Sequence, residues 1–126
     1  MMENEEKEKQ LIADIRSLFE ELKEIKKGKI VSGMYILPPN NYTYVKTAKE
    51  LIKKAYELSE LNTSYDTSGL ASVLNKEILR VSLHELEYDK NKKLKNKSVQ
   101  TLKGLMHDAT YHIRLYFMEV LGDIEV

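Results

Sequence analysis

The densest run of chemically able side chains in this sequence is LMHDATYHIRLYF, residues 105–117. Imidazole, carboxylate, phenol and guanidinium groups lie within ten positions of one another, on His107, Asp108, Tyr111, His112, Arg114 and Tyr116. Such groups can transfer protons, bind metal ions or hold anionic ligands. The sequence around them therefore has to be tested for catalysis, metal binding and recognition.

On a helix this run separates into two faces, because each residue turns the helix by about 100°. One face is apolar and predicts contact with a core; its members are Leu102, Leu105, Met106, Ala109, Ile113, Tyr116, Phe117 and Val120. The opposite face, called the interaction face below, carries His107, Tyr111, Arg114 and Met118. Tyrosine, methionine and arginine are enriched at protein interfaces. Three interpretations stay open: a helix of the same chain covers this face, a second copy covers it, or it lines a ligand pocket.

The three histidines, His84, His107 and His112, lack the spacing of a metal site. His107 and His112 are five residues apart, which places them about 140° apart on a helix. A zinc-binding helix of the zincin type uses two histidines four residues apart with a glutamate between them, and a di-iron bundle uses Glu-x-x-His pairs. Neither pattern occurs in the sequence, so we expect no metal and no cofactor.

The segment GLMHDATYHIRL resembles the phospho-acceptor helix of sensor histidine kinases and of bundle phosphotransferases. In those families a histidine followed by an acidic residue projects from a helical hairpin, so the resemblance implies that His107, followed by Asp108, accepts a phosphoryl group. The helical HEPN ribonucleases use an arginine and a histidine at a wider spacing than Arg80 and His84, so their motif is missing. With no cysteine and no serine elbow of the form G-x-S-x-G, the sequence favours binding over catalysis.

Hydrophobic periodicity predicts four helices, at residues 3–27, 42–61, 68–89 and 98–121. The first has a heptad seam of Leu11, Ile15, Leu18, Leu22 and Ile25. Asn40 or Asn41 can cap the second helix and Ser98 the fourth. We therefore expect an all-α fold, a four-helix bundle with a long first helix, formed as a single domain by residues 1–126.

Between the first two helices, KIVSGMYILPPNNYT has no helical period and predicts an extended loop that can hold a short strand. A lone strand needs a partner for its backbone groups, and a second copy of the chain could supply one. Candidate binding residues of this loop are Met34, Tyr35, Tyr42 and Tyr44.

The chain of 126 residues has 20 Lys+Arg and 20 Asp+Glu, hence a formal net charge of zero. Zero charge removes the global electrostatic argument for nucleic acid, and the basic run between Lys90 and Lys97 has neither an arginine nor an interleaved aromatic residue. The polar start MMENEEKEKQ and the lack of a long apolar stretch predict a cytoplasmic protein without a membrane partner.

The function that these patterns favour is that of a small oligomeric regulatory or adaptor protein that binds itself and another protein. The heptad seam, the apolar loop and the interaction face together imply more apolar surface than one small domain can bury. The alternative is a protein that binds a phosphorylated or nucleotide-like ligand through His107, Tyr111 and Arg114, with Tyr42 or Tyr44 nearby.

Overall fold

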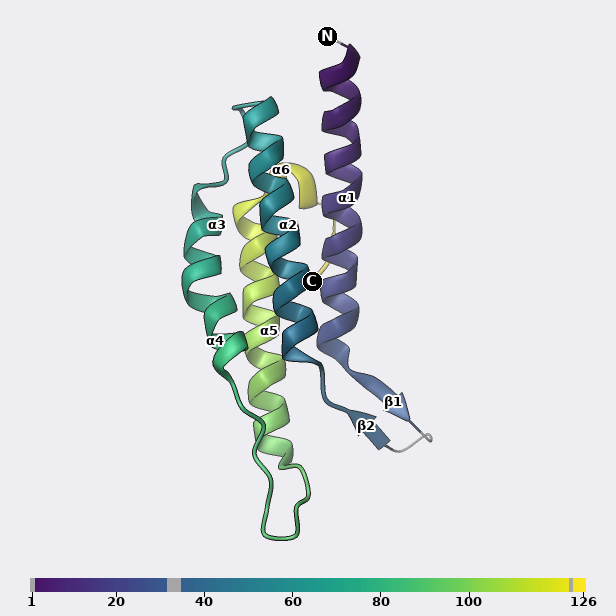
Figure 1. The fold of residues 1–126 in the computed structure, drawn as a ribbon, viewed down its shortest axis with the longest axis vertical. Coiled ribbons are helices and arrows are strands. Elements are labelled where there is room, and N and C mark those ends of the chain that lie inside the picture. The colour runs from purple at the N-terminus through teal and green to yellow at the C-terminus, as the bar shows by residue number, and fades with distance from the viewer. Residues whose placement is uncertain (1, 32–34, 123) are drawn as a thin grey trace.

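The computed structural model describes residues 2–31, 35–122 and 124–126, and these form an all-α fold with one short β-hairpin (Figure 1). The helical elements are α1 (Met2–Lys27), α2 (Asn41–Leu61), α3 (Ser68–Ser72), η1 (Val73–Ile78), α4 (Leu79–Leu83), α5 (Asn96–Tyr116) and α6 (Met118–Leu121). Because α3, η1 and α4 follow one another without a break, four long helical rods lie along the long axis. The predicted all-α fold is confirmed, and the arrangement is compatible with a four-helix bundle.

The heptad seam of α1 packs within the chain. Ile15 and Leu22 are fully buried, and Leu11, Leu18 and Ile25 pack against the same core. The main neighbour of α1 is α2, beside which it runs in Figure 1. The seam that resembled a coiled coil in the sequence is therefore satisfied by helices of the same molecule.

A two-stranded antiparallel hairpin follows α1, with β1 (Lys29–Val31) paired to β2 (Tyr35–Leu37) and Ile30 opposite Ile36. The expectation of a lone strand that needs a second copy is wrong, since the strand finds its partner six residues along the same chain. Gly28 ends α1 with a φ of 76°, a conformation that favours glycine. Asn40 begins α2, as predicted, by accepting a hydrogen bond from the Thr43 N–H at 2.9 Å.

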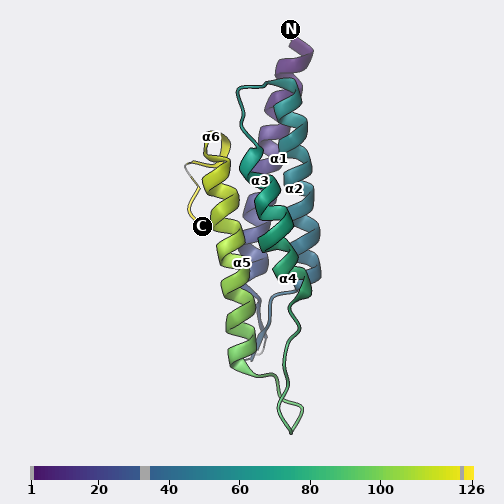
Figure 2. The same ribbon diagram turned by 90° about the vertical axis from the view of Figure 1, so that its left-hand side faces the viewer.

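The third helix ends at Leu83, six residues before the predicted boundary at Asp89. Asn41, at the start of α2, donates from Nδ2 to the carbonyl oxygens of Val81 at 3.4 Å and His84 at 3.0 Å. These bonds satisfy carbonyl groups that the end of a helix leaves free. The chain then runs extended, past the end of the bundle, before it returns into α5 (Figure 2).

The start of α5 corrects a second prediction, because Ser98 is not its N-cap. The helix begins at Asn96, and the buried Ser98 hydroxyl instead accepts a hydrogen bond from the Glu87 N–H at 2.9 Å. His84 Nε2 lies 3.1 Å from the Ser98 carbonyl oxygen. Ser98 thus holds the extended segment after α4 against the first turn of α5. The predicted fourth helix also breaks at Phe117, where φ is −135° and ψ is 43°.

The core lies where α1, α2, η1 and α5 meet, and it encloses one polar cluster. The Tyr44 hydroxyl lies 3.0 Å from the Met106 carbonyl oxygen and 2.6 Å from Thr110 Oγ1, and the Thr110 hydroxyl donates to that carbonyl at 2.7 Å. Tyr44 and Thr110 are both fully buried. Burial raises the pKa of the Tyr44 hydroxyl well above its usual range, and the negative charge of Glu77 adds to this rise.

Candidate functional site on α5

The interaction face predicted on the fourth helix is divided among three environments. His107, near the middle of α5, lies beside α1, with its Nδ1 atom 3.0 Å from the Lys26 ammonium nitrogen. Partial burial lowers the pKa of Lys26, and the positive charges of Lys23 and Lys27 lower it further. Among the described side chains, no carboxylate lies within ion-pair distance of Lys26. This basic pair is therefore left without a counter-charge.

Arg114 binds the chain's own C-terminal segment. Its Nε donates to the Ile124 carbonyl oxygen at 2.6 Å, and Nη2 donates to the Gly122 carbonyl oxygen at 2.7 Å. Part-buried Ile124 and Val126 pack against the core. The prediction that Arg114 contacts a partner or an anionic ligand is corrected accordingly, because its guanidinium group already holds the backbone after α6.

Tyr111 and Met118, the other two members of the face, remain exposed. Tyr111 is 43% exposed, Leu115 one turn later is 40% exposed, and Met118 at the start of α6 is 49% exposed. We call Tyr111, Leu115 and Met118 the α5 stripe. These three large side chains, two on α5 and one at the start of α6, are open to contact with another molecule.

A second cluster lies across the seam between α5 and the third helix. His112 Nδ1 forms a short contact with the Glu77 carboxylate, and both side chains are partly buried. Glu77 belongs to η1, whose backbone follows the wider π pattern instead of the α pattern. Such π segments are rare and often occur at functional sites.

Aromatic rings surround this Glu77–His112 pair. The His112 ring stacks on Tyr116 with centroids 5.9 Å apart and an interplanar angle of 21°, and Tyr111 meets its edge at 5.5 Å. Tyr116 also lies close to Gly69, where an added Cβ would come within 2.5 Å of the Tyr116 ring. Gly69 thus lets α3 approach α5 closely, which brings Glu77 within reach of His112.

The chemistry open to this pair is limited to proton transfer and hydrogen bonding. A carboxylate on Nδ1 orients an imidazole and leaves Nε2 for an outside group. Among the described residues, no hydrogen bond involves His112 Nε2, and no three side chains of His, Asp or Glu are grouped to hold a metal ion. Four of the hollows along α1 and α2 are lined by described residues that do not include His112.

The loop candidates are scattered. Met34 lies outside the described residues, and for Tyr35 only the backbone in β2 is described. Tyr42, in the first turn of α2, is 74% exposed. Tyr44 is the buried core residue described above, so its prediction as an accessible binding residue is wrong. The structure does not bring Tyr42 or Tyr44 into one pocket with His107, Tyr111 and Arg114.

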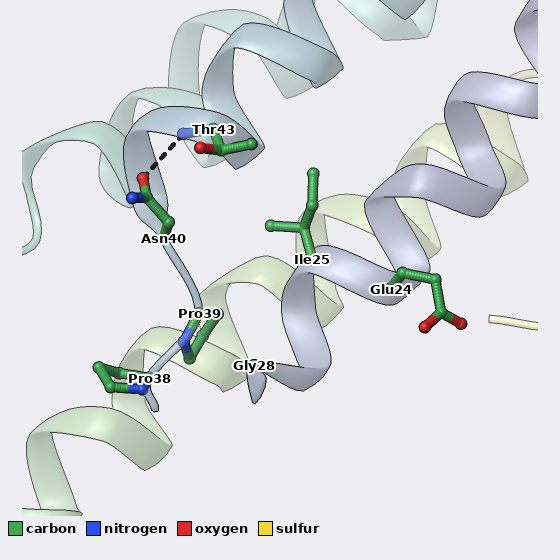
Figure 3. Close-up of a pocket in the computed structure, with 7 residues that line it drawn as sticks. All are labelled: Glu24, Ile25, Gly28, Pro38, Pro39, Asn40 and Thr43. Atoms are coloured by element: carbon green, nitrogen blue, oxygen red, sulfur yellow. Dashed lines mark hydrogen bonds between the residues drawn. The ribbon is translucent and has the colours of Figure 1, made fainter. Parts of the chain in front are cut away.

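A hollow of about 530 Å³ lies at the base of the β-hairpin (Figure 3). Its lining comes from the end of α1, the Pro38-Pro39 linker and the start of α2, as Glu24, Ile25, Gly28, Pro38, Pro39, Asn40 and Thr43. One carboxylate and no cationic side chain belong to this set. The lining therefore suits a neutral or cationic group better than a phosphorylated ligand.

Sequence reasoning missed Glu77 and Lys26, the two residues that engage the histidines of α5. Lys26 is 81 residues from His107, and no local pattern links them. Glu77 did leave a signal, since it stands three residues after Leu74 and four before Val81, within an apolar stripe. A carboxylate at that position predicts a polar partner on the facing helix.

Comparison of the chain with family models, with curated proteins and with solved structures found no match. In the described part of the chain, no helix combines the length and apolar character that crossing a bilayer requires. The function is therefore argued from the side chains themselves.

Proposed function

We propose that the protein is a protein-binding module that pairs with a second copy of itself through the α5 stripe and acts as a small adaptor. The observation that carries this proposal is the exposure of Tyr111, Leu115 and Met118, which is 40–49%. Tyr111 and Leu115 lie one turn apart on α5, and Met118 follows the break at Phe117. Tyrosine and methionine are enriched at protein interfaces, and Leu115 between them adds apolar area that contact with another protein would remove from water.

The charges favour a second copy as the occupant. The end of the molecule that holds the N-terminus is acidic, with Glu3, Glu5, Glu6 and Glu8 at the start of α1 and Glu57 and Glu60 at the end of α2. The opposite end carries six lysines between Lys90 and Lys103. Two copies packed antiparallel along α5 place each acidic end beside a basic end.

The register of such a pair follows from the stripe. If Tyr111 of one copy faces Leu115 of the other, the residues beyond this pair on each side come next to each other. They lie one turn further out on α5 in one copy, and in α6, after the break at Phe117, in the other. These residues are His107, which already contacts Lys26, and the exposed Glu119. The basic pair that lacks a counter-charge within its own chain would thus receive the carboxylate of Glu119 from the second copy.

Sedimentation equilibrium of the wild type and of two matched variants tests this proposal. We expect a concentration-dependent dimer for the wild type, and a monomer for Leu115→Ser combined with Tyr111→Ser. Leu83→Ser is the control, because Leu83 is 69% exposed on α4 and lies outside the stripe; it should dimerise as the wild type does. A strictly monomeric wild type at the highest soluble concentration would refute self-association.

Charge exchange tests the antiparallel register. His107→Glu should weaken the dimer, because it places two carboxylates opposite each other, and adding Glu119→Lys in the same chain should restore it. Failure of the second substitution to restore the dimer, while the stripe variants still abolish it, would keep the interface and reject this register.

A further inference from the structure

The lysine-rich segment after α4 is an ordered turn. The Asp89 carboxylate accepts hydrogen bonds from the N–H groups of Asn91 at 2.8 Å and Lys93 at 2.9 Å, and the Asp89 N–H donates to the Lys93 carbonyl oxygen at 2.8 Å. A bridge pairs Tyr88 with Leu94, and the Lys95 N–H donates to the Glu87 carbonyl oxygen at 2.8 Å. We call residues 87–95 the lysine hairpin. It is a short two-stranded ribbon with a fixed tip.

Lys92, at the tip of the lysine hairpin, has a left-handed backbone conformation that is unfavourable for residues other than glycine. Lys92 has a φ of 61°, and no other non-glycine residue in the described ranges has a positive φ. Glycine or asparagine occupies such turn positions at lower conformational cost. The turn geometry alone therefore does not account for a lysine at this position, and its exposed charge is the remaining feature to explain.

The charges of the lysine hairpin are largely uncompensated by its own chain. Lys95 pairs with Glu87 at 3.8 Å. For Lys90, Lys92 and Lys93, no ion pair with another described side chain is found. The hairpin extends beyond the end of the helices in both views (Figures 1 and 2), so its tip is free of steric obstruction.

We propose that the lysine hairpin binds the phosphodiester backbone of nucleic acid without sequence preference. A two-stranded ribbon fits the major groove of a duplex, and lysines that contact phosphates bind by releasing counterions. Tyr88, 59% exposed at the base of the hairpin, offers a ring for stacking on an unpaired base. The tip sequence DKNKK contains no apolar side chain that could enter a membrane.

The zero net charge of the chain does not oppose this proposal. Charges are screened over about 8 Å at physiological salt, whereas a helix of the 21 residues of α5 is about 30 Å long. The acidic end of the molecule lies at the far end of that helix from the hairpin. A polyanion at the tip of a single molecule therefore experiences the lysines and little of the glutamates of its own chain. In the antiparallel pair proposed above, the acidic end of the second copy would lie beside the hairpin, so binding is measured at protein concentrations below those at which the chain pairs.

Fluorescence anisotropy with a labelled mixed-sequence duplex and a labelled single strand, measured across salt concentrations, tests the proposal. Non-specific binding of this kind has a Kd of about 1–100 µM and weakens steeply with salt. Lys92→Gly removes one charge and suits the backbone of the turn, so affinity should fall several-fold and the salt slope by about 1, while thermal stability should stay equal or rise.

Charge reversal and its control complete the test. Lys90→Glu with Lys93→Glu should reduce affinity by at least about tenfold at low salt, because two attractive contacts become repulsive. Lys7→Glu with Lys9→Glu makes the same change of charge at the acidic end of α1 and should leave binding unchanged.

Three outcomes would overturn the proposal: no binding at low salt, equal losses in the hairpin and α1 variants, or hairpin-dependent binding to phosphatidylserine vesicles without binding to either nucleic acid. The last result would assign the hairpin to lipid headgroups. All of these variants leave the α5 stripe intact. Because the hairpin and α1 substitutions also change the charged ends that the proposed pair sets side by side, sedimentation of each variant separates a loss of self-association from a loss of nucleic-acid binding.

Discussion

The inward and outward sides of α5 differ in how far their side chains are buried and hydrogen-bonded by the rest of the chain. On the inward side, Met106, Thr110 and Ile113 are fully buried, and each buried side-chain polar atom in the described structure has a hydrogen-bond partner. On the outward side, Tyr111 and Leu115 are about half exposed and no other element covers them. One helix thus carries a completed surface that specifies the fold and an open surface that is available for binding.

The largest expected difference in the free energy of unfolding is between substitutions at Ile113 and Leu115, which are two residues apart on α5. Ile113→Ala should lower the free energy of unfolding by about 2–5 kcal/mol, because it opens a cavity in the core. Leu115→Ala should change it by less than about 0.5 kcal/mol at low protein concentration, since its side chain is already in contact with water. Urea denaturation measures both values.

The same pair of variants also tests how far the outward side is open. If self-association contributes to stability, the wild type should become more stable with rising protein concentration, and Leu115→Ala should reduce that dependence. Equal losses for both variants at low concentration would mean that the outward side is covered within the monomer.

The inward side was predictable from the sequence because burial follows helical period. Every residue predicted for the core face of the fourth helix packs against the core except Tyr116, which is 43% exposed. Helix ends were predictable where a local signal acts, as at Asn40 and Gly28. The predicted helix end at Asp89 and the predicted N-cap at Ser98 were wrong. Asn41 donates to the His84 carbonyl oxygen, and the Ser98 hydroxyl accepts from the Glu87 N–H, so both groups are engaged by residues outside their own helix.

The outward side was only partly predictable, because its neighbours come from remote segments. Tyr111 and Met118 are exposed as an interaction face requires, whereas Arg114 and His107 contact the C-terminal segment and Lys26. In the sequence, the lysine run is recognisable only by its composition, which predicts no defined structure. Its order depends on the Asp89 carboxylate and on the pairing of Tyr88 with Leu94, and composition alone does not reveal these contacts.

A smaller loss in the free energy of unfolding is expected when a hydroxyl group is removed from the buried polar cluster on the inward side. Tyr44→Phe removes a hydroxyl that contacts Met106 and Thr110, and should cost about 1–2 kcal/mol, since Thr110 still bonds the Met106 carbonyl. Thr110→Val should cost a similar amount. A combined cost well below the sum would confirm that the two hydroxyls act as one unit.

The pH dependence of Tyr44 has a definite sign. Burial raises the pKa of its hydroxyl above the unfolded value of 10.0, so the folded state holds the proton where the unfolded state releases it. The stabilisation is complete below pH 10 and is lost as the pH rises beyond it. Tyr44→Phe should therefore lose less stability than the wild type between neutral and strongly alkaline pH, as measured by thermal unfolding.

A still smaller loss in the free energy of unfolding is expected at the Glu77–His112 pair, which lies between the inward and outward sides of α5. Glu77→Gln removes the charge of the Glu77–His112 pair but keeps an acceptor, and should cost about 0.5–1 kcal/mol because water screens the partly exposed side chains. Glu57→Gln, on the exposed surface of α2, is the control and should cost less. High salt should narrow the difference between the two variants. Identical stability of both would mean that the pair contributes no net free energy.

The smallest effect on stability is expected at the Asp66 carboxylate, which is exposed. Asp66, before α3, accepts a hydrogen bond from the Ser68 N–H at 3.0 Å, which lowers the pKa of its carboxyl below the ordinary 3.8. A lowered pKa contributes stability that is present above the unfolded pKa and is lost as the pH falls through the folded one. Asp66→Asn keeps the acceptor and should match the wild type at neutral pH, with a difference in thermal stability appearing only below about pH 4. A loss at neutral pH would show that the charge of Asp66, and not its hydrogen bond, supports the start of α3.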